Sequence, residues 1–349
     1  MAKIRIIVAG AGDRGTAHAR SAVKLSDGRA EIVGVAEPRE YYRNQMAEEF
    51  GIPPEGVFAD WRDMAERELF ADAVIIATQD AMHTAPTEAF AEKGYHILLE
   101  KPMAPEPDEC RRIINAVTAN DRIFAVCHVL RYTPYTKALK AIVDSGALGE
   151  IASMDRVEPL GFWHQAHSYV RGNWRNEKDS SSMLLAKSCH DIDWMHYIMG
   201  ARCTAVSSFG SLQHFRPECQ PEGAAERCMA CGVESTCPYS AKRIYFSRLR
   251  KGETEWPLNV VVPDPTEERL TKALETGPYG QCVYMCDNDV VDHQVVNMQF
   301  DTGATASFTM TGFNKGGHRQ TRIFGTRGEL IGDGSIIKVY DFLTDTWTE

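Results

Sequence analysis

What this 349-residue chain lacks already excludes several classes of protein. No apolar run approaches the ~18–20 residues of a membrane-spanning helix, and the longest runs, residues 4–10 and 73–77, have the length of strands. No block of five Lys or Arg residues occurs and the net charge is −10, which makes nucleic acids and anionic membranes poor partners. The chain has no internal repeat or low-complexity tract, which excludes repeat, fibrous and disordered proteins.

The first residues also lack the basic segment and apolar stretch of a secretory signal, because they read as a strand that enters a glycine turn. We therefore expect a cytoplasmic protein, whose ten cysteines are thiols or metal ligands rather than a disulfide framework. The composition, 44% hydrophobic and 25% charged, is that of a globular protein. Its length exceeds the ~250–300 residues at which single cores stop growing, so two domains are expected.

The first domain, residues 1–129, is predicted from strands that alternate with helices. This alternation is typical of a parallel, doubly wound α/β sheet. The expected strands are residues 3–9, 31–36, 57–59, 73–78, 96–99 and 123–127, and the expected helices follow Gly15 and cover residues 41–50, 61–69, 84–93 and 108–119.

The second domain, residues 130–349, begins near His128–Arg131, where this rhythm changes. A helix over residues 135–144 and a strand over 150–158 are followed mainly by strands. These later strands are residues 291–300, 304–312, 320–324, 328–331 and 336–340. The pattern predicts an α+β domain with a large, mainly antiparallel open sheet and a cysteine-rich insert around residues 214–240.

A glycine turn, Gly10–Gly15, follows the first strand and opens a helix, and Glu37 ends the second strand 22 residues later. The glycines let the backbone approach a pyrophosphate at the helix N-terminus, and Glu37 would accept ribose hydroxyls and repel a 2′-phosphate. NAD is therefore expected rather than NADP, although Arg39 could pair with that phosphate, and Glu37 could simply be solvated. The expected cofactor-binding residues are Gly10, Gly12, Asp13, Arg14, Gly15, Glu37, Arg39, Thr78, Glu100 and Lys101.

Glu100-Lys101-Pro102 directly follows the fifth strand, at the carboxyl edge where open α/β sheets bind ligands. A lysine there can stabilise charge that develops on a substrate oxygen. The alternative is a surface lysine before a proline turn.

Four segments in order resemble the glucose-fructose oxidoreductase and inositol dehydrogenase (Gfo/Idh/MocA) family. They are the glycine turn 10–15, the motif 100–102, the segment 131–134 leading to 145–151, and the helix Cys189-His190-Asp191-Ile192-Asp193. The resemblance implies a Rossmann domain, a sheet-rich second domain, NAD(H) or NADP(H), and sugar or cyclitol substrates. It also implies a homodimer or homotetramer that associates through the open sheet. The family's catalytic lysine maps onto Lys101 and its helix histidine onto His190.

One position departs from the family, because Ala186 stands where many members carry an aspartate four residues before the histidine. Lys187, His190 and Asp193 are expected near one side of a single helix. His190 is the expected base for the hydroxyl proton, Lys101 would steady the alkoxide, and Lys187 is the alternative base if burial lowers its pKa. His190 could instead be only a packed core residue.

The segment from Phe162 to Arg175 is dense in aromatic and hydrogen-bonding groups, as sugar-binding surfaces are. It could also be a polar loop packed over the domain interface. The expected substrate-binding residues are Trp163, His164, Arg171, Arg175 and, from the helix, Asp193.

Three cysteines, Cys228-x2-Cys231-x5-Cys237, lie in an irregular segment, Pro217–Pro238, with no evident core of its own. This spacing predicts a structural zinc with His214 as fourth ligand or Cys219 in its place; free thiols and an iron–sulfur cluster are the alternatives. Cys282 and Cys286 are expected to be packing residues, although Cys282 could line the substrate cleft.

These observations favour an NAD-dependent oxidoreductase that acts on a secondary alcohol of a sugar, sugar derivative or cyclitol. A redox-assisted glycoside hydrolase, in which NAD transiently oxidises a ring carbon, and a non-catalytic nucleotide sensor are the alternatives. The chain stops soon after Tyr340, where relatives usually continue into a helical segment, so a short natural form or a shortened chain is expected.

Overall fold

A computed structural model describes residues 3–349 and divides the chain into two compact units. The first unit extends to Cys127 and the second runs from His128 to Glu349. Each is described by itself. Within the described residues, no helix combines the length and apolar character needed to cross a bilayer.

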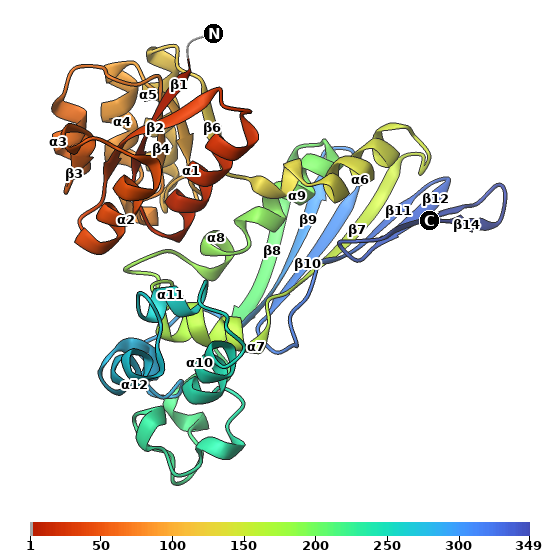
Figure 1. Ribbon diagram of the computed structural model, residues 1–349. Coiled ribbons are helices and arrows are strands. Elements are labelled where there is room, and N and C mark those ends of the chain that lie inside the picture. Colours follow the sequence, from red (N-terminus) through yellow and green to blue (C-terminus); the bar gives the residue numbers. More distant parts are fainter. Residues whose placement is uncertain (1–2) are drawn as a thin grey trace. The chain divides into compact units, whose positions relative to one another are not determined.

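The first unit is a six-stranded parallel sheet in the order β3-β2-β1-β4-β5-β6, which confirms the predicted doubly wound α/β fold (Figure 1). Its strands are β1 (Ile4–Ala9), β2 (Ala30–Ala36), β3 (Val57–Phe58), β4 (Ala73–Ile76), β5 (His96–Leu99) and β6 (Phe124–Val126). Its helices are α1 (Asp13–Leu25), α2 (Glu40–Phe50), α3 (Trp61–Glu66), α4 (Thr84–Lys93) and α5 (Pro107–Ala119).

The central strand β1 is apolar on both sides because helices cover both faces of the sheet. Ile7 packs in one cluster with Phe90 of α4 and Ile113 of α5, whereas Val8 packs in another with Ala19 of α1 and Met46 of α2. Successive side chains of a strand point to opposite faces, so a nearly continuous apolar run satisfies both layers. The strand order reverses between β1 and β4, and the crevice at such a reversal is where open α/β sheets bind ligands.

The second unit is built on an eight-stranded sheet in the order β14-β13-β12-β11-β7-β10-β9-β8. The β7–β10 pair is parallel and the other neighbouring pairs are antiparallel, as the prediction of a mainly antiparallel sheet requires. The strands are β7 (Ile151–Pro159), β8 (Cys203–Ser211), β9 (His293–Phe300), β10 (Thr305–Thr311), β11 (Gln320–Gly325), β12 (Gly328–Gly332), β13 (Ile337–Asp341) and β14 (Thr346–Thr348).

Helices α6 (Pro134–Asp144) and α9 (Cys189–Met199) lie along one face of this sheet (Figure 1). Trp194 and Met195 of α9 and Leu139 of α6 are buried in one cluster with Met154 of β7 and Phe308 of β10. This cluster fixes α9 against the sheet and therefore positions His190. Two shorter helices, α7 (Phe162–His164) and α8 (Met183–Ala186), and a π-helical segment, Gln165–Arg171, lie between β7 and α9.

The long connection between β8 and β9 has a core of its own, contrary to the expectation for the cysteine-rich insert. It contains helices α10 (Ala241–Leu249), α11 (Leu258–Val261) and α12 (Glu267–Thr276). Phe215, Cys228 and Cys282 are buried in one cluster with Tyr245 of α10 and Leu270 of α12. These helices were not predicted, because Pro257, Pro263 and Pro265 interrupt the stretch that contains them and its apolar runs are short.

Candidate active site

The glycine turn lies between β1 and α1, where two of its glycines are required by close backbone contacts. Gly10 has φ +97°, and a Cβ atom there would lie 2.5 Å from the carbonyl oxygen of Ala77. A Cβ at Gly15 would lie 1.9 Å from the carbonyl oxygen of Gly10. Gly12 is the N-cap of α1 and supplies no side-chain cap to the first N–H groups. The turn thus leaves a helix N-terminus open at backbone level, which suits a pyrophosphate.

Glu37 follows β2 beside this turn and is 3% exposed. Its carboxylate accepts the backbone N–H of Ala11 at 3.0 Å and two bonds from the Arg39 guanidinium at 2.7 and 3.1 Å. Burial would raise the Glu37 pKa, but the hydrogen bonds and charge of Arg39 outweigh burial and hold this pKa below its ordinary value. The Arg39 side chain is 56% exposed and lies over the Tyr42 ring, so a ribose would compete with a surface guanidinium for this carboxylate.

Glu100, at the end of β5, joins the Lys101 motif to the glycine-turn helix. Its carboxylate accepts Nε of Arg14 at 2.8 Å, is 2.7 Å from Nε2 of His18, and accepts the backbone N–H of Lys101 at 2.8 Å. Burial raises the pKa of Glu100, but His18 and Arg14 outweigh it and lower the pKa to about 2. The bond between Glu100 and Arg14 therefore holds α1 next to Lys101. Both residues belong to the predicted cofactor-binding set.

We expect the ionised Glu100 carboxylate, held by Arg14 and His18, to stabilise the fold above about pH 4.5. This stabilisation should be lost as the pH falls through about 2. An ionised Glu100 is favoured in the folded state, so protonation removes up to about 3 kcal/mol of the free energy of unfolding. Urea unfolding of wild type and Glu100→Gln at pH 7 to 3 measures this effect. The difference between the two proteins should be constant near neutrality and shrink below pH 4.5, whereas Glu68→Gln, an exposed control, should show little difference. A difference that grows in acid would contradict the assignment.

His83 is a residue of this edge that the sequence analysis missed. Its ring is 1% exposed, with Nδ1 2.8 Å from the carbonyl oxygen of Pro102 and Nε2 3.2 Å from that of Thr78. It therefore ties the turn after β4 to the turn after β5 and fixes the backbone next to Lys101. Its position between two predicted ligand-binding turns was the available signal.

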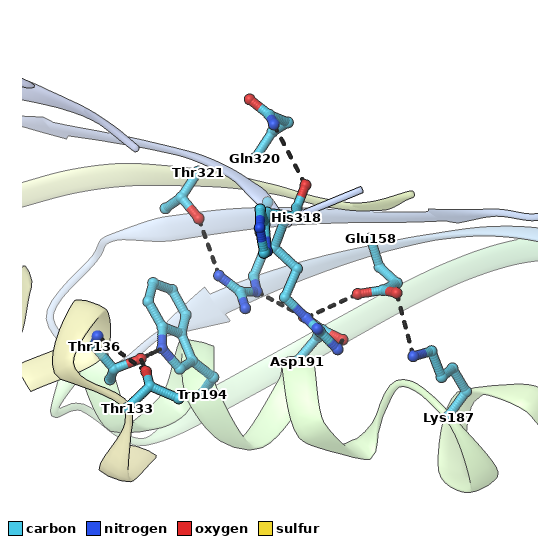
Figure 2. Close-up of polar contacts among 11 residues, drawn as sticks. Thr133, Thr136, Glu158, Lys187, Asp191, Trp194, His318, Gln320 and Thr321 are labelled. Atoms are coloured by element: carbon cyan, nitrogen blue, oxygen red, sulfur yellow. Dashed lines mark hydrogen bonds and ion pairs between the residues drawn. The ribbon is translucent and has the colours of Figure 1, made fainter. Parts of the chain in front are cut away.

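In the second unit, Lys187 and His190 do not share one helix, which corrects the predicted arrangement. Lys187 is the C-cap of α8, and Ser188 is the N-cap of α9, which carries His190. The Lys187 ammonium is 3.3 Å from the Glu158 carboxylate of β7 (Figure 2). Burial lowers the pKa of Lys187 below its ordinary value, although the Glu158 charge opposes this.

Glu158 and Lys187 belong to a buried charge network that the sequence analysis missed (Figure 2). The Arg319 guanidinium lies 2.8 Å from Glu158 and binds both oxygens of Asp191, at 2.6 and 3.1 Å. Asp191, in α9, is fully buried and also accepts Nε of Arg156 at 2.8 Å. Burial raises the Asp191 pKa, but the two arginines outweigh it and lower this pKa. The network fixes the first turn of α9, where His190 stands.

The Asp193 carboxylate is held by Arg131, whose Nε donates to it at 2.8 Å. His128 Nδ1 lies 3.7 Å from the same carboxylate, and the His128 and His190 rings are 6.3 Å apart. The predicted substrate ligand Asp193 is therefore occupied by a neighbouring guanidinium, and it positions the segment that begins the second unit.

The predicted sugar-binding residues separate into different surroundings. The rings of Trp163 and His164 stack with their centroids 5.5 Å apart. The Trp256 ring lies 5.3 Å from Trp163 and 4.9 Å from His164, so the three side chains form one aromatic cluster. Arg175 is engaged by Asp287 at 2.5 Å. Arg171 is 1% exposed in the core of the insert and donates to two backbone carbonyls, which corrects its assignment to the substrate pocket.

The predicted zinc ligands are not gathered as one tetrahedral set. Nε2 of His214 lies 3.1 Å from the Tyr284 hydroxyl, and His214 is not among the residues that line a cavity with Cys228, Cys231 and Cys237. Among the described residues, the set of three potential ligand atoms that all lie within 4.8 Å of one another is His18, Glu100 and Cys127. Arg14 already occupies the carboxylate of that set.

Comparison with known proteins identifies the family. Residues 4–128 match the family model of the oxidoreductase family, NAD-binding Rossmann fold. Residues 140–342 match the model of the same family's C-terminal alpha/beta domain. The chain therefore belongs to the Gfo/Idh/MocA oxidoreductase family, which confirms the resemblance drawn from the motifs.

Individual relatives are distant and longer. The Bacillus subtilis scyllo-inositol 2-dehydrogenase (NAD(+)) is 28% identical over 218 residues, 60% of this chain and 58% of that protein. The Thermotoga maritima myo-inositol 2-dehydrogenase is 27% identical over 214 residues, 60% of this chain and 59% of that protein. The chain thus spans about three fifths of these curated relatives. A solved levoglucosan dehydrogenase complex with NADH and levoglucosan shares the fold, with a TM-score of 0.68 and 21% identity over 97% of this chain and 76% of that chain.

Proposed function

We propose that this protein is an NAD-dependent dehydrogenase that moves a hydride between nicotinamide and a secondary alcohol of a sugar, sugar derivative or cyclitol. The observation that carries the proposal is the buried Glu37 carboxylate beside a glycine turn that leaves the N-terminus of α1 open. Membership of an NAD-binding oxidoreductase family supports it. The substrate class is supported by the inositol and levoglucosan dehydrogenases among the relatives.

In this proposal, NAD would supply the hydride acceptor when bound, and residues of this chain would stabilise charge and move the proton. Gly10, Gly12 and Gly15 would receive the pyrophosphate, and Glu37 would accept a ribose hydroxyl. Lys101, fixed through Glu100 and His83, would stabilise negative charge on the substrate oxygen. His190, at the start of α9, would take the hydroxyl proton. Lys187 has the smaller role, because Glu158 already pairs with its ammonium.

We expect NAD to bind at least about tenfold more tightly than NADP, or about 1.4 kcal/mol, because the Glu37 carboxylate repels a 2′-phosphate. Glu37→Gln should weaken NAD binding by about tenfold through loss of charge-assisted hydrogen bonds. The exposed Glu40→Gln, at the start of α2, is the control. Calorimetric titration of both cofactors measures the affinities. NADP binding as tight as NAD in the wild type would make Arg39 the determinant instead.

The reaction is tested by incubating the full chain with NAD and a panel of free sugars, anhydrosugars and cyclitols. NADH formation with at least one polyol, abolished when the polyol is left out, is expected. Tight NAD binding without turnover of any secondary alcohol in the panel would favour a nucleotide sensor.

We also propose a cytoplasmic homodimer or homotetramer. None of the ten cysteines, all within residues 3–349, is paired in a disulfide, which is compatible with a reducing compartment. The edge strand β8 is mostly exposed and includes Val206 and Phe209, which are 62% and 74% exposed and provide an apolar surface for a second copy. Light scattering measures the assembly. The structural metal expected at the insert is a separate proposal that does not depend on the dehydrogenase reaction.

A further inference from the structure

Four cysteines of the second unit line one cavity inside the insert. Cys228, Cys231 and Cys237 come from the irregular segment before α10, and Cys282 comes from the segment after α12. The cavity measures ≈ 80 Å³, far below the ~300–1,000 Å³ of pockets for organic ligands. Its size and its donors therefore suit an inorganic centre rather than a sugar.

A buried cation on the wall of this cavity provides a second, independent observation. Arg171 is 1% exposed, and its guanidinium donates to the carbonyl oxygens of Gln281 and Tyr239, at 2.7 and 2.9 Å. The Nη2 atom of Arg171, which donates to Tyr239, also lies 3.4 Å from the sulfur of Cys228. Its Nη1 atom is buried and has no hydrogen-bond partner among the described residues.

This guanidinium has no carboxylate partner at ion-pair distance within residues 3–349. Glu234, the carboxylate on the cavity wall, accepts the Ser240 hydroxyl and lies 4.0 Å from Lys242. Buried charges are normally paired, because an unpaired charge loses its hydration. Neutral thiols supply no countercharge, whereas metal-bound thiolates form an anionic centre that would balance Arg171.

The spacing of the sulfur atoms distinguishes between metals. A single zinc ion with Zn–S bonds of ~2.3 Å holds its four sulfurs ~3.8 Å apart. No three of these cysteine sulfurs lie within 4.8 Å of one another among the described residues. An iron–sulfur cube with one cysteine at each iron separates the cysteine sulfurs by roughly 6 Å.

We propose that Cys228, Cys231, Cys237 and Cys282 bind a [4Fe–4S] cluster, with Arg171 as the buried countercharge beside it. Cys282 takes the place that the sequence analysis gave to His214. The cluster would join the irregular segment to the chain that leads into β9, and so hold the insert together. This site is independent of NAD and of hydride transfer.

The test is anaerobic purification of the full chain, followed by measurement of iron, acid-labile sulfide and zinc. About four iron and four sulfide per chain are expected, together with a visible absorption that dithionite bleaches. Cys282→Ser should lose most of the iron. Cys219→Ser and Cys286→Ser, whose thiols point to the carbonyl oxygens of Gln213 and Cys282, should retain it.

Arg171→Met should reduce cluster occupancy or change its reduction potential, while Arg248→Met, a cationic control in α10, should do neither. Circular dichroism and NAD titration of each variant report whether the chain remains folded.

One zinc per chain without iron would overturn the cluster. No metal after anaerobic reconstitution with iron and sulfide would overturn the site. Retention of iron by Cys282→Ser with loss in Cys219→Ser would overturn the ligand set. None of these results depends on turnover, so they are distinct from a failure of the dehydrogenase proposal.

Discussion

Replacing His190 by alanine is expected to lower turnover by about 10²–10⁴-fold, because a general base acts on the transition state. Lys101→Ala is expected to have a similar effect, because it removes charge stabilisation at the substrate oxygen. NAD affinity should change little in either variant. Steady-state rates with the best substrate of the panel and calorimetric titration of NAD measure the two quantities separately.

Each variant has a control on its own element or unit. His196→Ala changes an exposed histidine of α9, and Lys93→Ala changes an exposed lysine at the end of α4; both should remain near wild-type activity. Lys187→Ala should have a milder effect than His190→Ala, since the Lys187 ammonium pairs with Glu158. An inactive Lys187→Ala protein together with an active His190→Ala protein would reverse the two roles.

The second large effect concerns stability. Arg319→Met is expected to lower the free energy of unfolding by about 3–5 kcal/mol, because it leaves the buried Asp191 and Glu158 carboxylates without their shared cation. Methionine keeps most of the side-chain volume, so the loss measures charge rather than a cavity. Urea unfolding followed by circular dichroism measures it.

Arg322→Met is the matched control for this change. Arg322 lies in β11, is about half exposed, and makes a surface ion pair with Glu329 at 3.6 Å. Its loss should cost at most about 1 kcal/mol. Equal destabilisation by the two variants would mean that the network contributes no more than a surface pair.

The first unit could be predicted from sequence because its signals are local. Strand, glycine turn and helix follow one another within a short stretch of sequence, and Glu37 and Glu100 directly follow strands β2 and β5. The partners of these residues could not be predicted. Arg14 and Glu100 are 86 positions apart, and only the sheet order brings the end of β5 beside α1.

The second unit was less predictable, because its site residues depend on contacts across the sheet. Arg319 and Asp191 are 128 positions apart. One signal was available, since Arg156 and Glu158 stand two and four residues after Met154 along β7 and therefore share its buried face. The break at Lys187 and Ser188 gave no comparable signal, as neither residue disrupts a helix by itself.

The cysteine-rich segment shows a further limit of local spacing. Cys228, Cys231 and Cys237 were recognised as a set because they are close in sequence. Cys282 lies 45 positions beyond Cys237 and was assigned to packing, although it lines the same cavity. The same long-range folding places Arg171 among the thiols rather than in a sugar pocket.

The most direct test of the proposed reaction is to incubate the full chain with NAD and separate pools of cyclitols, free sugars and glycosides in deuterated water. Absorbance follows NADH, and NMR follows the products. A dehydrogenase forms one NADH for each oxidised product and leaves no solvent deuterium on the ring carbons, and this is the expected result. Glycoside cleavage without accumulation of NADH, with deuterium at a ring carbon, would contradict it.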